Sequence, residues 1–296
     1  PALSMVPLQP INGGHQRRTG YDLSVDASIL RNRFVIWNMV LNLSHYSYRW
    51  VERFKEDDRT TYLNADDPVL AIYAFETNGI LQVGEEPPVY QPSTAKLPGC
   101  PKFVDKNGDN KLDSADVVIY DQTPKFTIGF GNTIKYKNFD LTINLYGQLG
   151  SYKQNYSLNW AIAKNFIAGS SAGEQNATVD IKNAWSTQNP GGTLPGVAYD
   201  EYTLGNIGNT VGWGSNVTIS KADFIRIRNI TLGYNINNSF IRKIAKSIRI
   251  YLDFQNPFII TKFKGVDPEI ETPSVKGGAA PYPMVKNYTL GINVNF

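Results

Sequence analysis

The last eleven residues of the chain, 286–296, read KNYTLGINVNF, and their side chains alternate between two kinds. One set is apolar (Tyr288, Leu290, Ile292, Val294 and Phe296), and the other is small or polar (Asn287, Thr289, Gly291, Asn293 and Asn295). Successive side chains of a β-strand point to opposite faces of a sheet. This period of two therefore predicts a strand that is apolar on one face and polar on the other.

The same alternation recurs upstream and predicts an all-β chain with antiparallel strands. The seven predicted strands lie near 21–30, 34–46, 125–136, 139–146, 222–236, 247–256 and 286–296. Their connections are by turns short (31–33, 137–138 and about 237–246) and long (47–124, 147–221 and 257–285). Bacterial barrels join their strands by short periplasmic turns and longer extracellular loops, so this rhythm favours a barrel.

A soluble β-sandwich would also alternate, but three features favour a transmembrane β-barrel in the cell outer membrane. The strands reach ~10 residues, the length that a tilted membrane strand needs. Their polar face is rich in Asn, Thr, Ser and Gly, as in a wet lumen. Aromatic residues collect at the short-turn ends (Tyr136, Phe139, Tyr234 and Phe296). Residues 21–296 are thus predicted to be the C-terminal part of the barrel wall, with 1–20 in an extracellular loop.

The strand count predicts further strands, and the composition argues against several classes of function. Seven strands would leave lipid-exposed edges, so more strands are expected before residue 1. Net charge is +3 with no basic stripe, which argues against a nucleic-acid partner. The single cysteine, Cys100, allows no intrachain disulfide, and His15 and His45 have no metal-ligand spacing. We therefore predict no enzymatic activity.

One loop has the ligand spacing of an EF-hand-type calcium site. Oxygen donors stand at positions 1, 3, 5, 7, 9 and 12 of a twelve-residue stretch: Asp105, Asn107, Asp109, Lys111 through its carbonyl, Asp113 and Asp116. Position 6 is Asn110 where Gly is usual, and position 12 is Asp where Glu is usual. The spacing predicts a structural Ca²⁺ ion, and the alternative is a solvated acidic turn.

The long loops also carry aromatic residues that could contact a ligand or pack on the loops themselves (Trp160, Trp185, Tyr199, Tyr202 and Trp213). The pair Asp267 and Glu269 resembles a carboxylate dyad, but no acid or base can be placed beside it from the sequence. The pattern designates no substrate-binding residue.

Several stretches, taken in order, resemble the C-terminal third of SusC/RagA-type TonB-linked outer-membrane proteins. The segment 78–82 (NGILQ) with Glu85 and Glu86, and the loop 105–116, are similar to segments of that family. Further matching stretches are 124–132 (PKFTIGFGN), 136–141 (YKNFDL), 224–235 (FIRIRNITLGYN), 255–258 (QNPF), 265–269 (GVDPE), 282–283 and the last strand.

The resemblance implies a 22-stranded barrel, the size class of outer-membrane transporters with a plugged lumen. It implies a SusD-like surface lipoprotein over the outer loops, energy from the TonB complex through a region upstream of this chain, and a glycan or peptide substrate. TonB-dependent import is therefore the expected function. The first alternative is a barrel of this family that serves as a structural scaffold in a multi-protein outer-membrane assembly. The second is a soluble calcium-dependent carbohydrate-binding module.

Overall fold

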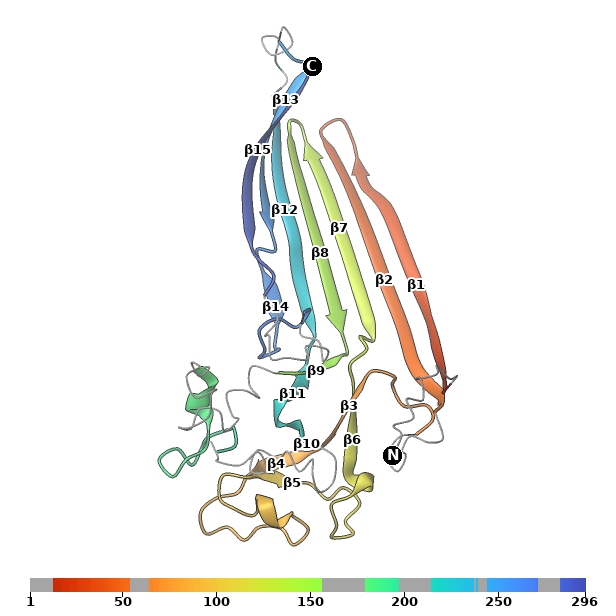
Figure 1. Cartoon of the computed structure of the whole chain (residues 1–296). Helices are drawn as coiled ribbons and strands as arrows, with labels where there is room; N and C mark the ends of the chain where they lie inside the picture. The colour runs from red at the N-terminus through yellow and green to blue at the C-terminus, as the bar shows by residue number, and fades with distance from the viewer. Residues whose placement is uncertain are drawn as a thin grey trace, which may run out of the picture.

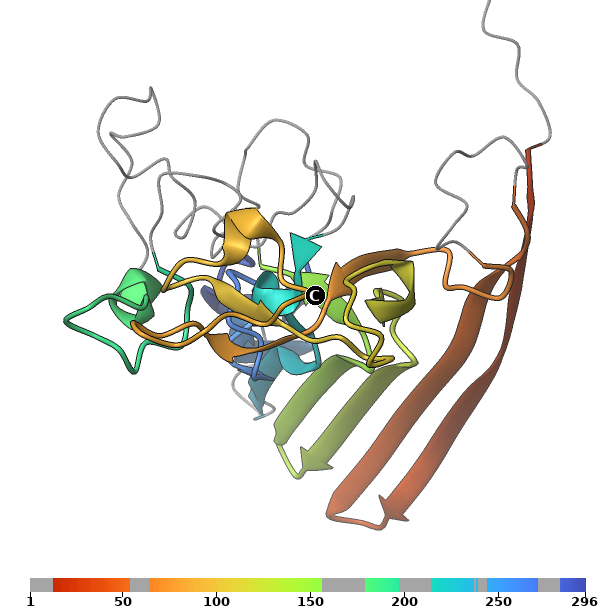
Figure 2. The same ribbon diagram turned by 90° about the horizontal axis from the view of Figure 1, so that it is seen from below.

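A computed structural model describes residues 13–53, 64–155, 179–196, 214–236, 238, 244–270 and 283–296. Seven long strands form one antiparallel sheet in sequence order (Figure 1). They are β1 (His15–Arg31), β2 (Val35–Glu52), β7 (Phe126–Tyr136), β8 (Phe139–Leu149), β12 (Phe224–Ile236), β13 (Ser247–Gln255) and β15 (Asn287–Asn295). The short strand β14 (Ile259–Thr261) pairs with the start of β12. Seen from the loop end, the sheet is a single curved layer (Figure 2).

Three strands are longer than the sequence predicts. β1 begins at His15, so residues 15–20, which the sequence placed in an extracellular loop, continue the strand. β2 runs to Glu52 and β8 to Leu149, past their predicted ends at 46 and 146. The pairing of β1 with β2 continues in register from Gln16 opposite Trp50. Apolar alternation fades in these extensions while backbone pairing persists, so periodicity underestimates strand length.

The long connections contain small sheets and short helical turns. β3 (Ala71–Phe75) lies between β10 (Gly214–Ser215) and β6 (Val117–Asp121). β4 (Thr77–Ile80) pairs with β5 (Pro101–Phe103), and β9 (Tyr152–Gln154) with β11 (Ile219–Lys221). The 3-10 turns are η1 (Ser93–Ala95), η2 (Ser114–Asp116), η4 (Val179–Asn183) and η6 (Asn216–Thr218). In the described part of the chain, no helix has the length and apolarity required to cross a membrane.

The main cluster of buried apolar residues lies in this loop lobe, and the long sheet contributes Phe224, at the start of β12, as a separate buried side chain. The cluster consists of Phe75, Leu81, Ala95, Cys100 and Phe103. On the sheet, by contrast, Leu290 is 71% exposed and Tyr288 66% exposed. A single layer cannot bury an apolar face by itself, so that face needs a partner other than water.

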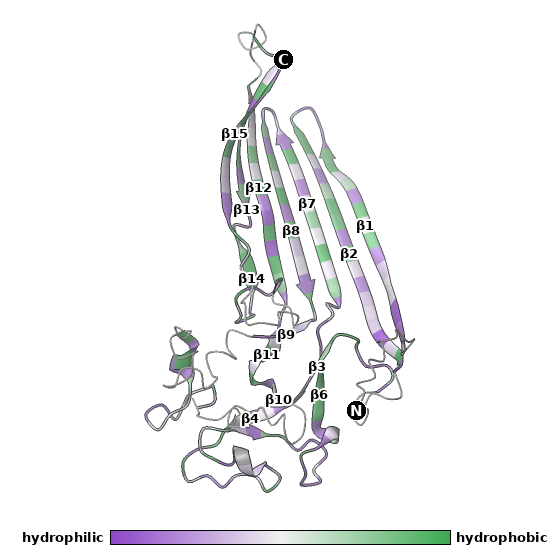
Figure 3. Ribbon diagram, viewed as in Figure 1, coloured by the Kyte–Doolittle hydropathy of each residue, from purple (hydrophilic) through white to green (hydrophobic). Residues whose placement is uncertain are grey.

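The register sorts side chains into continuous rows across the strands. On one face, each of the seven strands contributes one residue to an apolar row: Leu30, Trp37, Ile134, Leu141, Leu232, Leu252 and Leu290. The opposite face carries the row Ser28, Asn38, Thr133, Thr142, Thr231, Asp253 and Thr289. Figure 3 shows the resulting alternation of apolar and polar residues along each strand. Asn132 is a polar member of the apolar face, and its Oδ1 accepts a hydrogen bond from Trp37 Nε1 at 3.0 Å.

Aromatic rings bound the apolar face at both ends. Near the short turns, the rings of Phe139 and Tyr234 lie 4.7 Å apart, and Tyr136 is the register partner of Phe139. Near the long loops, the ring of His45 lies 5.2 Å from that of Tyr21 and 5.1 Å from that of Phe126. On β7 the two rows are separated by the ten steps from Phe126 to Tyr136, which is ~33 Å along the strand.

Candidate functional site

The polar face of the sheet is the candidate functional surface, because its side chains present hydrogen-bonding groups without a covering layer. At its middle lies a hollow of about 310 Å³, and Gly129 and Gly131 form part of its floor. The amides of Asn38, Asn42 and Asn144 and the hydroxyl of Thr133 surround it. Since the glycines contribute no side chains, this hollow could hold a polar, uncharged group.

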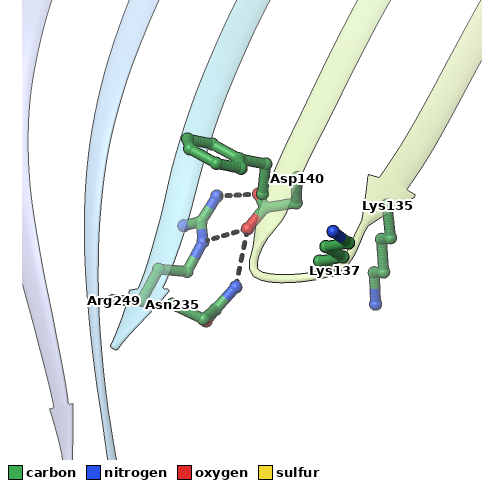
Figure 4. A pocket seen from close by; sticks show the side chains of 6 residues that line it. Lys135, Lys137, Asp140, Asn235 and Arg249 are labelled. Atoms are coloured by element: carbon green, nitrogen blue, oxygen red, sulfur yellow. Dashed lines mark hydrogen bonds and ion pairs between the residues drawn. The ribbon is translucent and has the colours of Figure 1, made fainter. Parts of the chain in front are cut away.

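A second cavity, of about 220 Å³, lies at the short-turn end of β7, β8, β12 and β13 (Figure 4). Lys135, Lys137, Phe139, Asp140, Asn235 and Arg249 line it. The Arg249 guanidinium holds Asp140 through two contacts, Nη2 to Oδ2 at 2.5 Å and Nε to Oδ1 at 3.1 Å. Asn235 Nδ2 donates to the same Oδ1 at 3.0 Å. Among the described residues neither lysine has an ion-pair partner, so the cavity has an excess of positive charge.

Gly233 makes room for this Asp140–Arg249 pair. A Cβ atom at position 233 would lie 2.6 Å from Arg249 Nε and Nη2 and 2.6 Å from Asp140 Oδ1. We therefore expect Gly233→Ala to displace the pair and to lower the free energy of unfolding by about 1–3 kcal/mol, a typical cost of overpacking. The measurement is the unfolding midpoint of the full-length protein in denaturant. Gly129→Ala is the control, because its nearest neighbour would lie 3.6 Å away; equal midpoints for both variants would contradict the steric argument.

At the other end of the sheet, the Asp267–Glu269 pair meets two arginines of β12. Arg226 Nη2 contacts both carboxylate oxygens of Asp267, at 2.6 and 2.8 Å, and its Nε reaches Glu269 Oε2 at 3.0 Å. Arg228 donates to the other oxygen of Glu269. Arg226 and Asp267 are each only 4% exposed. The sequence identified the two carboxylates but not their arginines, and the network acts as a clamp on the loop after β14 and not as an acid–base pair.

The aspartate-rich loop folds around its own backbone. Asp105 accepts hydrogen bonds from the N–H groups of Gly108 and Asn110, at 2.7 and 2.8 Å. Asp116, which is fully buried, accepts from those of Lys106 and Asp113, at 2.8 and 2.9 Å.

The other three acidic or amide side chains of the predicted calcium site behave in the same way. Asn107 accepts from Asp109 N, Asp109 from Lys111 N, and Asp113 from Ala115 N. In the part of the chain that the structure describes, no three carboxylate, imidazole or thiolate groups come together in a way that could hold a metal ion. Calcium binding therefore stays a prediction.

The remaining residues of interest lie in the loop lobe. Trp185 Nε1 donates to Gln82 at 2.8 Å, which ties the 179–196 segment to the core; the other four loop aromatics lie outside the described residues. Burial raises the pKa of the Cys100 thiol, which disfavours a nucleophilic thiolate. The pKa of Tyr73 is raised to about 12, mainly by burial and to a smaller extent by the neighbouring Asp67 carboxylate. The Tyr73 hydroxyl accepts a hydrogen bond from Arg53 and donates one to Asp67. These bonds give Tyr73 a structural role in the loop lobe.

Comparison with known proteins relates the whole chain to one class. No family model matches it. It is 28% identical to "TonB-dependent receptor P3" of Formosa agariphila over 325 residues, covering 100% of this chain and 30% of that protein. It is 27% identical to "TonB-dependent receptor SusC" of Bacteroides thetaiotaomicron over 301 residues, covering 96% and 27%. The chain thus spans about a third or less of the length of these curated relatives.

Solved structures show a similar fold. A structure of "the RagAB peptide importer in the 'closed-closed' state" matches with a TM-score of 0.67 and 22% identity, over 96% of this chain and 30% of that one. A structure of "the RagAB peptide transporter" matches with a TM-score of 0.66 and 21% identity. The likeness is one of fold, and it agrees with the antiparallel barrel wall that the sequence predicts.

Proposed function

We propose, on the premise that this chain is similar along its length to part of SusC/RagA-type TonB-dependent transporters, that it forms part of the wall of an outer-membrane nutrient importer. The main support for this proposal is the long sheet, which is a single layer with one exposed apolar face and one polar face. At the ~35–45° tilt of membrane barrels, the ~33 Å between the aromatic rows becomes about 25 Å across the membrane. This equals the apolar band of outer-membrane barrels.

The polar face supports a passage for a hydrogen-bonding substrate. Around the central hollow it offers amides and a hydroxyl, and the carboxylates of Asp26 and Asp253 lie on the same face at a similar height. Peptides and oligosaccharides both present such groups, and the RagAB neighbour is described as a peptide importer. The proposal includes a SusD-like lipoprotein on the outer loops and energy from TonB. The wall would bind and guide the substrate without reacting with it.

A deletion strain tests import directly. Cells without the gene for the full-length protein should take up a labelled peptide or oligosaccharide mixture more slowly, and a protonophore should slow wild-type uptake to the same level. Normal uptake in the deletion strain, with a changed set of outer-membrane proteins, would contradict import and favour the scaffold role.

The hollow on the polar face gives a residue-level prediction. Gly129→Trp should fill the hollow and lower uptake several-fold at equal protein abundance in the outer membrane, because a Cβ atom at position 129 fits without a backbone clash. Ile128→Trp is the matched control, since the adjacent residue lies on the apolar face. Equal uptake by the two variants would argue against passage along this face.

The proposal also includes Ca²⁺ as a structural ion of the loop 105–116. Two features support it: Asn110 adopts a φ of 63°, as position 6 of such a loop requires, and Asp116 is buried with only backbone N–H partners among the described residues. Extracellular calcium sites have Kd values of about 10⁻⁴–10⁻³ M, so ~5 mM Ca²⁺ should slow protease cleavage in this loop by roughly tenfold. Asp105→Ala should abolish the protection and Glu86→Gln should keep it. Equal cleavage of the wild type with Ca²⁺ and with a chelator would refute the site.

A further inference from the structure

Arg17 and Arg49 are register partners on the apolar side of β1 and β2, beyond the loop-end aromatic row of Tyr21, His45 and Phe126. From Gln16 to Ser28 the register is unbroken, so Arg17 and Thr19 lie on the same face as Tyr21. Their partners on β2 are Arg49 and Ser47. Toward the long loops, the register pairs on this face therefore change from two rings (Tyr21 and His45) to two hydroxyl residues and then to two arginines.

This arginine pair is only partly neutralised. Arg49 Nη2 lies 3.6 Å from the Asp121 carboxylate, and its Nε and Nη1 donate to Ser47 Oγ and Asp66 O, each at 3.3 Å. Arg17 is exposed and has no ion-pair partner among the described residues. Like charges directly opposite each other destabilise an antiparallel pair unless an anion lies between them.

The distance of the pair from the aromatic row places it at the depth of lipid headgroups, if the sheet lies in a membrane as proposed above. Arg17 lies four residues from Tyr21, on the side of the long loops. This separation is ~13 Å along the strand, or ~10 Å across a membrane at the tilt of barrel strands. Headgroups occupy the layer just beyond the ~30 Å hydrocarbon core, and aromatic rings mark its boundary. Guanidinium groups at that depth, with hydroxyl residues beside them in the register, have the chemistry that binds a phosphate group.

We infer that Arg17, Arg49, Thr19 and Ser47 form a binding site for the phosphate of an outer-leaflet glycolipid. This site holds the outer edge of the sheet at a fixed depth in the membrane, and it is distinct from any substrate path on the polar face. The inference rests on the membrane placement proposed above.

Native mass spectrometry of the detergent-purified, full-length protein tests the site, with diphosphoryl lipid A as the probe. Wild type should retain the lipid, and the double variant Arg17→Gln, Arg49→Gln should bind it at least about tenfold more weakly. Dephosphorylated lipid A should bind both proteins equally. Arg18→Gln is the matched control, because Arg18 lies on the opposite face and stacks on the Tyr46 ring at 3.7 Å; it should bind like wild type.

A thermal scan separates binding from a structural role. Without lipid, Arg17→Gln should be no less stable than wild type, because it removes an opposing charge. With diphosphoryl lipid A, wild type should gain stability and the variant should not. Equal lipid binding by wild type and the double variant, or an equal loss in Arg18→Gln, would overturn the inference. Membrane partitioning of the same samples tests the placement separately: a protein that stays out of membranes refutes the proposed function, whereas a membrane-inserted protein without phosphate preference refutes this site alone.

Discussion

Replacing Asp267 with alanine should destabilise the long-loop end of β12 by about 3–5 kcal/mol. The guanidinium of Arg226 is 4% exposed and takes two contacts from this carboxylate, so the substitution leaves a buried cation with Glu269 as its remaining partner. Removing one member of a buried pair costs more than the pair contributes, because the other charge stays desolvated. Amide hydrogen exchange in residues 224–228 and 259–269 is the measurement, since the effect should be local.

Two further variants make this prediction specific. Glu86→Gln removes the charge of an exposed carboxylate in the loop lobe and should leave exchange in these segments unchanged. The double variant Arg226→Met, Asp267→Leu should recover much of the loss, because it removes both buried charges together. If Asp267→Ala exchanges no faster than Glu86→Gln, the network does not clamp the loop.

The sequence predicts the long strands because their alternation is local and is imposed by one environment on each face. β7 spans 126–136 where the sequence indicates 125–136, and β15 spans 287–295 where it indicates 286–296. Toward the long loops both faces carry polar side chains, so the extensions of β1 and β2 lose the periodic signal. The pattern reports the contrast between two environments and ends where that contrast ends.

The side-chain contacts of the loop lobe could not be predicted because they join residues far apart in the chain. Arg226 meets Asp267 across 41 positions, Trp185 meets Gln82 across 103, and Thr77 meets Asn216 across 139. The aromatic row at the loop end is equally nonlocal, since His45 and Phe126 become neighbours only through the β2–β7 register. The spacing of the aspartates in 105–116 was visible, but spacing does not reveal which backbone N–H groups each side chain accepts from.

Placing an arginine at Ile143 should cost the full-length protein about 2–4 kcal/mol in a bilayer, and placing one at Thr142 should cost little. Ile143 lies on the apolar face about midway along β8, in register with Ile230 of β12, whereas Thr142 lies one residue away on the polar face opposite Thr133 and Thr231. A charge at the middle of the hydrocarbon layer loses its water, while a charge in a wet lumen keeps it. Equilibrium unfolding from phospholipid vesicles measures the difference.

The comparison tests the orientation of the sheet because the two residues share a strand and nearly the same height. Strand propensity, folding rate and expression should affect them alike, and only the medium on each face differs. The same pair in detergent should differ less, since a micelle deforms around a charge more easily than a bilayer. Equal costs in the bilayer would mean that water reaches both faces, and the sheet would then belong to a soluble protein whose apolar face is covered by another layer of protein. A large cost at Thr142 with none at Ile143 would reverse the assignment, placing the polar face against lipid and leaving the proposed passage without a wall.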